Sequence, residues 1–340
     1  MPPIDLFSDT HTLPDAAMRR AMAEAEVGDE QMGEDPTTAR LEAEVASLLG
    51  HERSLFLPTG SMCNKVAVAA LTRPGDAVVC DHLAHLYRFE GGGPAALSGV
   101  VFEPLQTESG HFTVDQLEAV FNQGNVYQPR TALVSMEQTH NFAGGTVWPW
   151  EQYGAVAGAT RTAGLSVFTD GARLLNAAAA SGISADRWGA EVDAVWIDFS
   201  KGLGAPGGAA IAGSEEFITA ANRFKYMLGG AMRQSGILAA ACLHGLTHNV
   251  AGLADDHARA RRLAAGLDGT GMAVESPQSN MVFFDPAPLG ISPGDLVGRL
   301  ATAGIRVSPV AGRIRAVTHL GVGDDDIDDA IAAIREQAGG

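Results

Sequence analysis

Short apolar runs alternate with helical patterns along the chain up to about residue 212. Each run ends beside a glycine, a proline or a charged residue, as strands commonly do. The runs predict strands at residues 55–57, 77–80, 100–103, 131–136, 165–170, 193–198 and 209–212. Strands that alternate with helices in this way are typical of a largely parallel sheet in an α/β fold.

The helical patterns divide the chain into two parts. Apolar residues at helical spacing predict a helix at residues 37–49, and a second helix begins near Gly60. After helices at 236–249 and 254–268, the pattern changes to short strands and helices, which predicts a second, smaller domain. We expect its strands at residues 281–285 and 313–317 and its helices at 293–303 and 324–337.

The composition is that of an ordinary globular protein. The chain has 340 residues, of which 46% are hydrophobic, so it can bury a large core. No apolar run is long enough for a membrane span, and the start Met-Pro-Pro-Ile-Asp lacks the regions of a signal peptide. We therefore expect a cytoplasmic protein without a membrane partner.

Cys63, Cys80 and Cys242 have neither disulfide nor zinc-site spacing, so we expect reduced, packed thiols.

The charge argues against one class of partner. A formal net charge of -17 without a basic cluster excludes a nucleic-acid partner, because such binding needs a basic face. Against this acidic background, Arg173, Arg233 and Arg315 lie beside glycines or apolar segments and are candidate anion ligands. The sequence thus favours a small anionic substrate or cofactor.

Lys201 is the first candidate for chemistry. It follows an apolar run that ends in Ser200-Lys201 and passes directly into glycines. If residues 193–198 form a strand, the amine leaves the core at the strand end, where α/β sheets bind ligands. A partly desolvated lysine amine can lose its proton and form a Schiff base. The alternative is a lysine that only caps the end of a buried strand.

Asp170 ends another expected strand and is followed by Gly-Ala-Arg173. Lys201 lies 31 residues further on, which suits one strand–helix–strand unit, so the carboxylate and the amine can face one crevice. Pyridoxal phosphate chemistry needs an amine for the aldehyde and a carboxylate that keeps the pyridine nitrogen protonated. The structural alternative is a buried ion pair of Asp170 with Arg173.

A phosphate site is predicted at Pro58-Thr-Gly60-Ser61, a turn into a helix. The first amides of a helix bind anions, and Ser61 adds a hydroxyl. In the alternative interpretation, Ser61 is only the N-cap of that helix.

His85 lies just after the strand that ends near residue 80, so its imidazole should also stand near the strand tips. There it can stack on a pyridine ring and handle a proton. His82 and His85 could instead ligate a metal, but the sequence offers no third ligand, and we predict no metal site.

The segment Gly202-Leu-Gly-Ala-Pro-Gly207 matches the dinucleotide-binding pattern GxGxxG. That fingerprint opens a helix, whereas Pro206 and the following Gly-Gly-Ala-Ala-Ile predict a turn into a strand. A nicotinamide oxidoreductase is therefore a minor alternative.

A series of motifs occurs in a fixed order: Ser8-Asp-Thr, Gly33-Glu-Asp-Pro-Thr, Gly60-Ser61, His85 with Glu90, Leu97-Ser-Gly, Glu137 with Thr139-His-Asn, Asp170-Gly-Ala-Arg, Ser200-Lys-Gly-Leu-Gly-Ala-Pro, Leu228-Gly-Gly with Met232-Arg-Gln, and Arg315 with Val317-Thr-His. Over nearly the whole chain, this order resembles the threonine aldolases, in the family of the aromatic amino acid β-eliminating lyases. They are pyridoxal phosphate enzymes of the aspartate aminotransferase fold, fold type I.

The resemblance implies an architecture. It implies a large domain with a mostly parallel seven-stranded sheet and a small C-terminal α+β domain. Residues 1–15 would form an N-terminal segment that contributes to the active site, residues 16–248 the large cofactor-binding domain, and residues 249–340 the small domain.

The resemblance also implies roles for single residues. Lys201 would form the Schiff base with pyridoxal 5'-phosphate, Asp170 would pair with the pyridine nitrogen, and His85 would stack on the ring. The remaining cofactor-binding positions are Gly60, Ser61, Arg173, Ser200 and Arg233, and the positions that bind the substrate carboxylate are Ser8, Arg173 and Arg315. Arg233 would reach the phosphate from a neighbouring subunit, which implies a homo-oligomer, a dimer that shares active sites or a tetramer.

The implied activity is that of an aldehyde-lyase. It would cleave an L-β-hydroxy-α-amino acid of the L-threonine or L-allo-threonine type into glycine and an aldehyde, with His85 or a water it orients accepting the hydroxyl proton. A β-elimination or a condensation of glycine with an aldehyde could use the same site. The alternative from a different functional class is a non-catalytic paralogue, which would not be an enzyme.

Seven positions depart from the family pattern, and we expect them near the pocket. They are Phe7, Met32, Arg88, Phe89, Gln138, Phe168 and Tyr226. Because a site with different polar groups accepts different hydroxy amino acids, we expect these changes to affect the choice of substrate side chain rather than the cofactor.

Overall fold

A central sheet of seven strands organises the larger part of the molecule, in a computed structural model that describes residues 3–339. The strands are β2 (Arg53–Leu57), β3 (Ala77–Asp81), β4 (Val101–Leu105), β5 (Thr131–Glu137), β6 (Ser166–Asp170), β7 (Ala194–Asp198) and β8 (Ala209–Gly213). Their order is β2-β8-β7-β6-β5-β3-β4, and only β8 runs antiparallel to its neighbours. The mostly parallel α/β sheet and its seven strands were all predicted, with bounds shifted by one or two residues.

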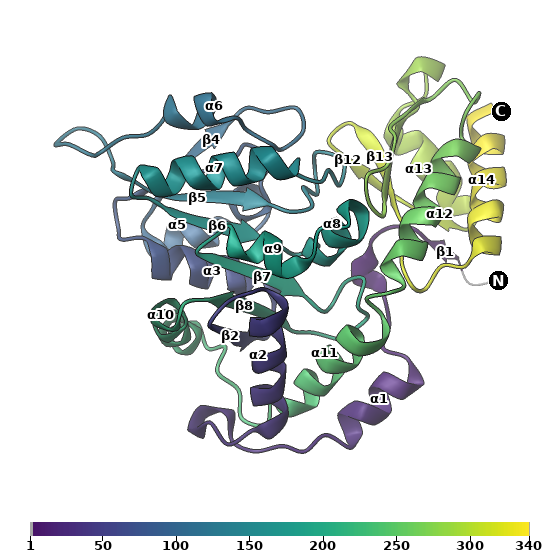
Figure 1. The fold of residues 1–340 in the computed structure, drawn as a ribbon. Helices are drawn as coiled ribbons and strands as arrows, with labels where there is room; N and C mark the ends of the chain where they lie inside the picture. Colours follow the sequence, from purple (N-terminus) through teal and green to yellow (C-terminus); the bar gives the residue numbers. More distant parts are fainter. Residues whose placement is uncertain (1–2, 340) are drawn as a thin grey trace.

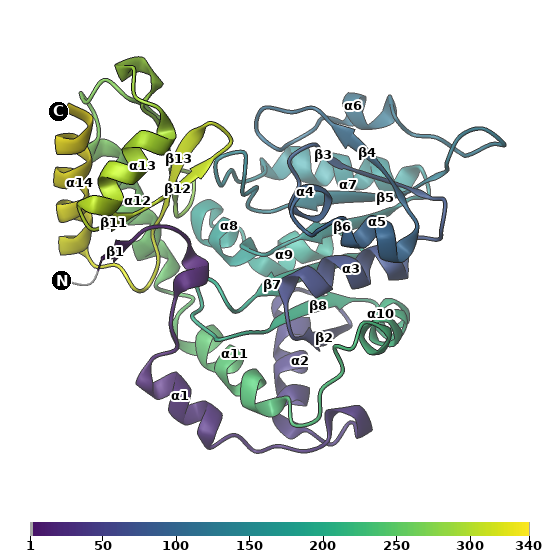
Figure 2. The same cartoon turned by 180° about the vertical axis from the view of Figure 1, so that it is seen from behind.

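Helices cover both faces of this sheet (Figures 1 and 2). Alternate side chains of the strands pack on two separate hydrophobic clusters, which explains why the strands are apolar throughout. One face is covered by α3 (Gly60–Leu71) and α10 (Glu215–Met227), with α4 (His85–Arg88) and α5 (Gly93–Ser98) beside α3.

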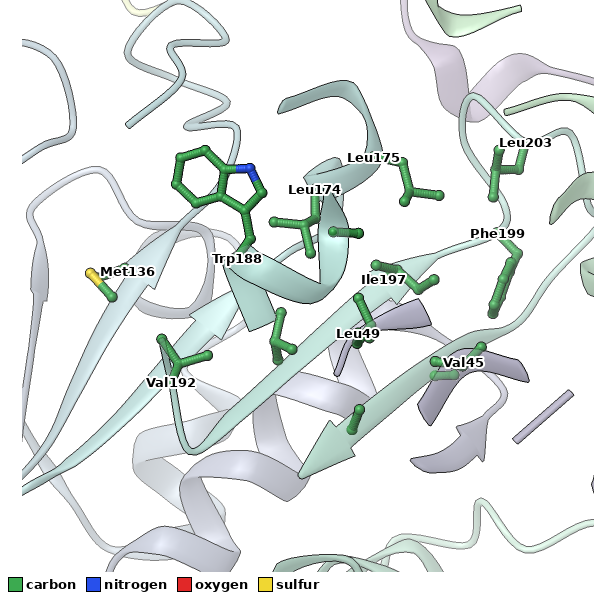
Figure 3. Close-up of a cluster of buried hydrophobic side chains, with 14 of the residues drawn as sticks. Val45, Leu49, Met136, Leu174, Leu175, Trp188, Val192, Ile197, Phe199 and Leu203 are labelled. Atoms are coloured by element: carbon green, nitrogen blue, oxygen red, sulfur yellow. The ribbon is translucent and has the colours of Figure 1, made fainter. Parts of the chain in front are cut away.

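The other face carries the larger cluster, part of which Figure 3 shows between β7 and the helices α2, α8 and α9. Trp188 and Ile197 meet there with side chains of the neighbouring helices. The helices that contribute to it are α1 (Ala16–Ala23), α2 (Pro36–Leu48), α6 (Val114–Glu118), α7 (Trp150–Thr162), α8 (Leu174–Ser181), α9 (Ala185–Ala190), α11 (Gly236–His248) and α12 (Leu253–Gly266).

The C-terminal part has its own sheet and core. Strands β9 (Ala273–Val274), β10 (Met281–Asp285), β13 (Arg313–Val317) and β12 (Ser308–Val310) form an antiparallel sheet, covered by α12, α13 (Pro293–Thr302) and α14 (Asp324–Gly339). The strands and helices predicted for this part are confirmed. Short 3-10 turns lie at Asp9–His11, Glu30–Met32 and Ala287–Leu289.

The N-terminal segment belongs spatially to this C-terminal part. Strand β1 (Ile4–Asp5) pairs in parallel with β11 (Ile305–Arg306), and Leu6 is buried in the same core. From there the chain crosses to α1, which packs against α11 (Figure 2). Residues 8–12 therefore lie between the two parts. Residues 1, 2 and 340, which the expected terminal segments include, lie outside the described residues.

Within residues 3–339, no single helix is both long and apolar enough to cross a membrane. Helices α11 and α12 meet the length and composition criteria only as a pair, and they are bent by 68° at their junction. Cys63, Cys80 and Cys242 are buried and unpaired, as the sequence predicts.

Candidate active site

The carboxyl ends of β5, β6 and β7 meet at one edge of the large sheet, facing the C-terminal part (Figure 1). The pairing of β5 with β6 places Glu137 beside Asp170, and the pairing of β6 with β7 places Asp170 beside Trp196. A cavity of about 390 Å³ opens at this edge, within the size range of small-molecule sites. Nine of the ten predicted site residues line it, namely Ser8, Gly60, Ser61, His85, Asp170, Arg173, Ser200, Lys201 and Arg315.

Three other hollows among the described residues have comparable or larger size. One of about 740 Å³ lies between α1, α2 and α11, one of about 410 Å³ lies beside α2 and β2, and one of about 490 Å³ is lined by residues between Gln106 and Gln116. None of them is lined by a predicted site residue, so the chemistry of the side chains favours the cavity at the strand ends.

Lys201 lies three residues beyond the end of β7, and its side chain is 17% exposed. Its Nζ is 3.0 Å from Oδ2 of Asp198, the last residue of β7, and 5.5 Å from the centre of the Trp196 ring. Asp198 is itself fixed, since Ser200 donates hydrogen bonds to its Oδ1 from its backbone N and its Oγ. The lysine does leave the core at a strand end, but it points its amine into a cavity rather than into solvent.

Asp170 ends β6 and is buried at the cavity wall. Its Oδ2 accepts a hydrogen bond of 2.8 Å from Asn64 Nδ2, and its Oδ1 accepts one from the backbone N of Ala172. Burial raises the pKa of Asp170 to about 6; Glu137 acts in the same direction, while the charges of His85 and Lys201 oppose it. The alternative ion pair of Asp170 with Arg173 is not what the structure contains, because Arg173 binds Asp9.

His85 begins the short helix α4 and is held by two carboxylates. Its Nδ1 lies 3.1 Å from Glu90 Oε1, and its backbone N donates to Glu137 Oε2 at 2.7 Å. Burial lowers the pKa of His85, but the hydrogen bond to Glu90 and the charges of Asp170 and Glu137 outweigh it, so the net shift is upward. With Nδ1 held by Glu90, Nε2 is the nitrogen left for a ligand.

The N-terminus of α3 forms another wall of the cavity through Thr59, Gly60 and Ser61. Thr59 is the N-cap, because its side chain accepts from the backbone N of Met62 at 3.3 Å. The alternative interpretation of Ser61 as N-cap is therefore wrong, and its hydroxyl is not used for that role. The first amides of a helix have no partner within the helix and attract anions.

Two arginines line the opposite side. Arg173 donates two hydrogen bonds to Asp9, of 2.7 and 2.6 Å, and both side chains are buried. Arg315 donates to Asn141 Oδ1 at 2.7 Å and to the backbone O of Phe7 at 3.3 Å. Burial, with the charge of Arg173 adding to it, lowers the pKa of Arg315 to about 10. The two guanidinium groups, together with Ser8, give this side a positive, hydrogen-bond-donating character.

Arg233 is the predicted residue that the structure does not bring to the cavity of this chain. Its side chain is 60% exposed and donates to Asp29 Oδ2 at 2.8 Å. Its predicted role depends on a second subunit and stays a prediction.

The seven departures from the family pattern do not gather at the pocket as expected. None of them is among the residues that line the cavity of the described chain. Phe168 lies on the same strand face as Asp170 but two residues further from the strand end, and it packs in the core beneath α3. Met32 and Tyr226 lie on the surface. Phe7 and Phe89 come nearest, since Phe7 carries the carbonyl that binds Arg315 and Phe89 stacks at 3.8 Å on Phe142 of the cavity wall.

Neither a dinucleotide-binding turn nor a metal site is found at the motifs that resemble them. Gly202 to Gly207 form a loop that leads into β8 rather than a turn that opens a helix, so the dinucleotide-binding fingerprint is absent there. His82 and His85 make separate contacts, with Asp81 and Glu90, and no group of three metal-ligating side chains lies together in the described chain.

Four residues at the site received no role from the sequence, although Asp9 and Asn141 belong to the motifs quoted above. Asn64 and Asp9 are buried polar residues that bind predicted site residues, Asp198 holds the lysine, and Asn141 holds Arg315. The signal for Asp198 was available, because it is a carboxylate at a strand end three residues before Lys201. Asn64 offered a weaker signal, as a polar residue within an otherwise apolar stretch of helix.

Comparison with known proteins identifies the family and the fold. The family model described as beta-eliminating lyase matches residues 5–287. The low specificity L-threonine aldolase of Escherichia coli K12 is 37% identical over 333 residues, covering 97% of each chain. The structure of Leishmania major threonine aldolase superposes with a TM-score of 0.85 at 20% identity, covering 99% of this chain and 100% of that one.

An aspartate aminotransferase from Thermus thermophilus has the same fold, with a TM-score of 0.74 at 18% identity over 99% of this chain and 92% of that one. The fold is therefore fold type I of the pyridoxal phosphate enzymes, as predicted. The family match covers most of the chain, and the chain belongs to the beta-eliminating lyase family.

Proposed function

We propose that this protein is a pyridoxal phosphate-dependent aldehyde-lyase that cleaves L-threonine or a related L-β-hydroxy-α-amino acid into glycine and an aldehyde. One observation carries the proposal: the amine of Lys201 and the carboxylate of Asp170 reach one cavity from neighbouring parallel strands, beside a helix N-terminus. The relatives named as low specificity L-threonine aldolases support this choice within the family.

The residues present fit the cofactor. Lys201 would hold it covalently, Asp170 would face the pyridine nitrogen, and His85 would lie against the ring. The amides and hydroxyl at Gly60 and Ser61 suit its phosphate, with Ser200 nearby. Two buried polar atoms of the cavity wall, Thr139 Oγ1 and Arg315 Nε, have no partner among the described residues, which fits a wall that binds a polar ligand.

When bound, pyridoxal phosphate supplies a ring that accepts electrons from the bonds of the amino acid α-carbon. The protein supplies orientation and proton handling. Ser8, Arg173 and Arg315 would bind the substrate carboxylate and so fix which bond of the α-carbon is broken. His85, whose Nδ1 is held by Glu90, would accept the β-hydroxyl proton at Nε2, directly or through a water.

The proposal includes an assembly, a homodimer that shares its active sites or a tetramer built from such dimers. Glu30 donates its backbone N to the carbonyl of Arg233, so the segments that carry Met32 and Arg233 lie together. Met32, Tyr226 and Met227 expose 70, 45 and 67% of their surface on these segments and on the end of α10, a surface that suits burial by a second copy. In that assembly Arg233 would reach the phosphate of the neighbouring site.

Two further predictions from the sequence belong to this proposal. One is the division into an N-terminal segment of residues 1–15, a large domain of residues 16–248 and a small domain of residues 249–340. The other is a cytoplasmic location.

The test uses purified protein with added pyridoxal phosphate and three substrates, L-threonine, L-allo-threonine and L-phenylserine. We expect glycine and the matching aldehyde from at least one of them. Lys201→Ala should lose both this activity and the visible absorbance of the bound cofactor. Because the matching family model is named for β-elimination, ammonia and a keto acid in place of glycine would assign that reaction instead. No reaction and no cofactor absorbance would refute the proposal.

A further inference from the structure

Asn64 is a fully buried asparagine on α3, one turn beyond Gly60, in an otherwise mostly apolar stretch of helix. It does not line the cavity, but it lies directly behind the cavity wall. Its side chain contacts three residues that do line the cavity, through hydrogen bonds to Asp170, Glu90 and Trp196. A polar side chain in this position needs an explanation, since burying an amide is costly unless all its groups are bonded.

The orientation of the Asn64 amide is fixed by Trp196. The indole nitrogen can only donate, and it lies 2.9 Å from Asn64 Oδ1, so the oxygen must face the indole. The Nδ2 group must then face the two carboxylates. It donates to Glu90 Oε1 at 2.7 Å and to Asp170 Oδ2 at 2.8 Å, which uses both of its hydrogens.

These bonds connect the two groups proposed to contact the cofactor ring. Asp170 receives one hydrogen directly. The same Glu90 oxygen that accepts from Asn64 also lies 3.1 Å from His85 Nδ1, so the position of His85 depends on a carboxylate that Asn64 holds. Lys65, the next residue of α3, approaches the second Glu90 oxygen at 3.5 Å.

We propose that Asn64 is a positioning residue that sets Asp170 and, through Glu90, His85 in the places where they contact the cofactor. The inference rests on the proposed function, since it concerns residues that would hold pyridoxal phosphate. A neutral donor suits this position. It bridges two buried carboxylates without adding a charge that would compete with the cofactor for Asp170.

The test measures the dissociation constant for pyridoxal phosphate and the kinetics of L-threonine cleavage in two variants of similar shape. Asn64→Asp keeps an acceptor for the Trp196 indole but loses the amide hydrogens, and Asn64→Leu loses all three bonds. We expect both to weaken cofactor binding about tenfold or more, because each loses hydrogen bonds to charged groups. We expect kcat to fall while KM for L-threonine stays within about threefold of wild type, because the arginines that face the substrate carboxylate do not touch Asn64.

Asn176→Leu is the matched control. Asn176 is also buried and also donates through Nδ2, to Asn280 Oδ1 at 3.1 Å, but it contacts neither Asp170 nor Glu90. It should lower the thermal stability of the protein and leave cofactor affinity unchanged. A purely structural role for Asn64 predicts that its variants behave like Asn176→Leu, and this outcome would overturn the inference.

The two proposals fail in different ways. If the wild-type protein binds pyridoxal phosphate and both Asn64 variants bind it within about twofold of wild type, the inference on Asn64 is wrong and the proposed function stands. If the wild-type protein does not bind pyridoxal phosphate, the proposed function falls and takes the inference with it. Should Asn64→Leu not fold, Asn64→Asp carries the same comparison, because it keeps the size of the side chain.

Discussion

Arg173 and Asp9, 164 residues apart in sequence, form a buried bidentate ion pair, with 2.7 Å from Nε to Oδ2 and 2.6 Å from Nη2 to Oδ1. The pair ties the N-terminal segment to the loop after β6, where Arg173 lies three residues beyond the strand end. Burial would raise the pKa of Asp9, but the Arg173 charge and its hydrogen bonds outweigh burial and hold this pKa well below its ordinary value. Asp9 therefore stays ionised throughout the physiological range and orients the guanidinium at the cavity wall.

We predict that Asp9→Asn destabilises the protein strongly. Removing one charge of a buried pair leaves the other uncompensated, which typically costs about 3–5 kcal/mol. Urea unfolding at neutral pH measures the effect. Asp5→Asn is the control, because Asp5 pairs with Arg306 and His11 at partly exposed positions, where an ion pair contributes about 0–1 kcal/mol. Equal losses in the two variants would contradict the importance assigned to the buried pair.

Arg315→Lys tests the predicted carboxylate site. The lysine keeps a positive charge but loses the fork of donors, including the Nε that has no partner among the described residues. We expect KM for L-threonine to rise about tenfold or more, while the dissociation constant for pyridoxal phosphate stays near wild type. Arg313→Lys is the matched control on the same strand, since Arg313 pairs with Glu275 and does not line the cavity. A rise in KM of the same size in both variants would argue against a contact of Arg315 with substrate.

Gly60→Ala tests the close approach of α3 to β7. A Cβ at this position would overlap the Trp196 ring and lie 3.0 Å from Asp198 Oδ2. Because the overpacked indole belongs to a buried strand, we expect a loss of about 1–3 kcal/mol in unfolding free energy together with weaker cofactor binding. Gly158→Ala on α7, where a Cβ meets nothing within 4 Å, should instead be neutral or stabilising. Thermal unfolding with and without pyridoxal phosphate separates the two variants, and a fully stable Gly60→Ala protein would show that α3 can move away from β7.

The sequence predicted those parts of the site that depend on local pattern and sheet topology. Buried parallel strands are apolar on both faces, so their bounds could be recognised, and parallel strands send their carboxyl ends to one edge. For this reason Asp170 and Lys201 were expected to face one crevice, and both line the same cavity. The turn at Gly60 was predicted for the same reason, as a strand that leads into a helix.

The contacts that the sequence did not predict depend on the path of the chain in three dimensions. Asp9 reaches Arg173 only because β1 joins the C-terminal part and brings residues 8–12 between the two parts. Phe168 was expected near the pocket, but it lies two residues before the end of β6 and packs in the core instead of lining the cavity. The role predicted for Arg233 would involve a second chain, so the structure of one chain does not test it.

Asp256 provides a prediction about pH. It lies in the first turn of α12 and is 2% exposed, and its carbonyl accepts a hydrogen bond from Thr318 Oγ1. Burial raises the pKa of its carboxyl to about 7, the nearby Asp9 and Asp255 act in the same direction, and Arg259 opposes them. In the unfolded chain the same group titrates near 3.8, its ordinary value.

The sign of the effect follows from linkage. Between about pH 4 and about pH 7 the folded protein keeps a proton on Asp256 that the unfolded chain has lost, so stability falls as the pH rises through this window. Asp256→Asn cannot ionise, and Arg259 keeps its second partner, Asp324. We therefore expect the variant to exceed wild type in unfolding free energy by about 1–3 kcal/mol at about pH 8, and to match it at about pH 4.

Thermal unfolding at the two pH values measures this difference, with Asp255→Asn as control. Asp255 is the exposed neighbour on the same turn, so its substitution should change stability little at either pH. If Asp256→Asn is less stable than wild type at the higher pH, the 3.4 Å contact with Arg259 outweighs burial, and the carboxyl is ionised in the folded protein. In that case Asp256 would hold the first turn of α12 through its charge, in the way that Asp9 holds Arg173.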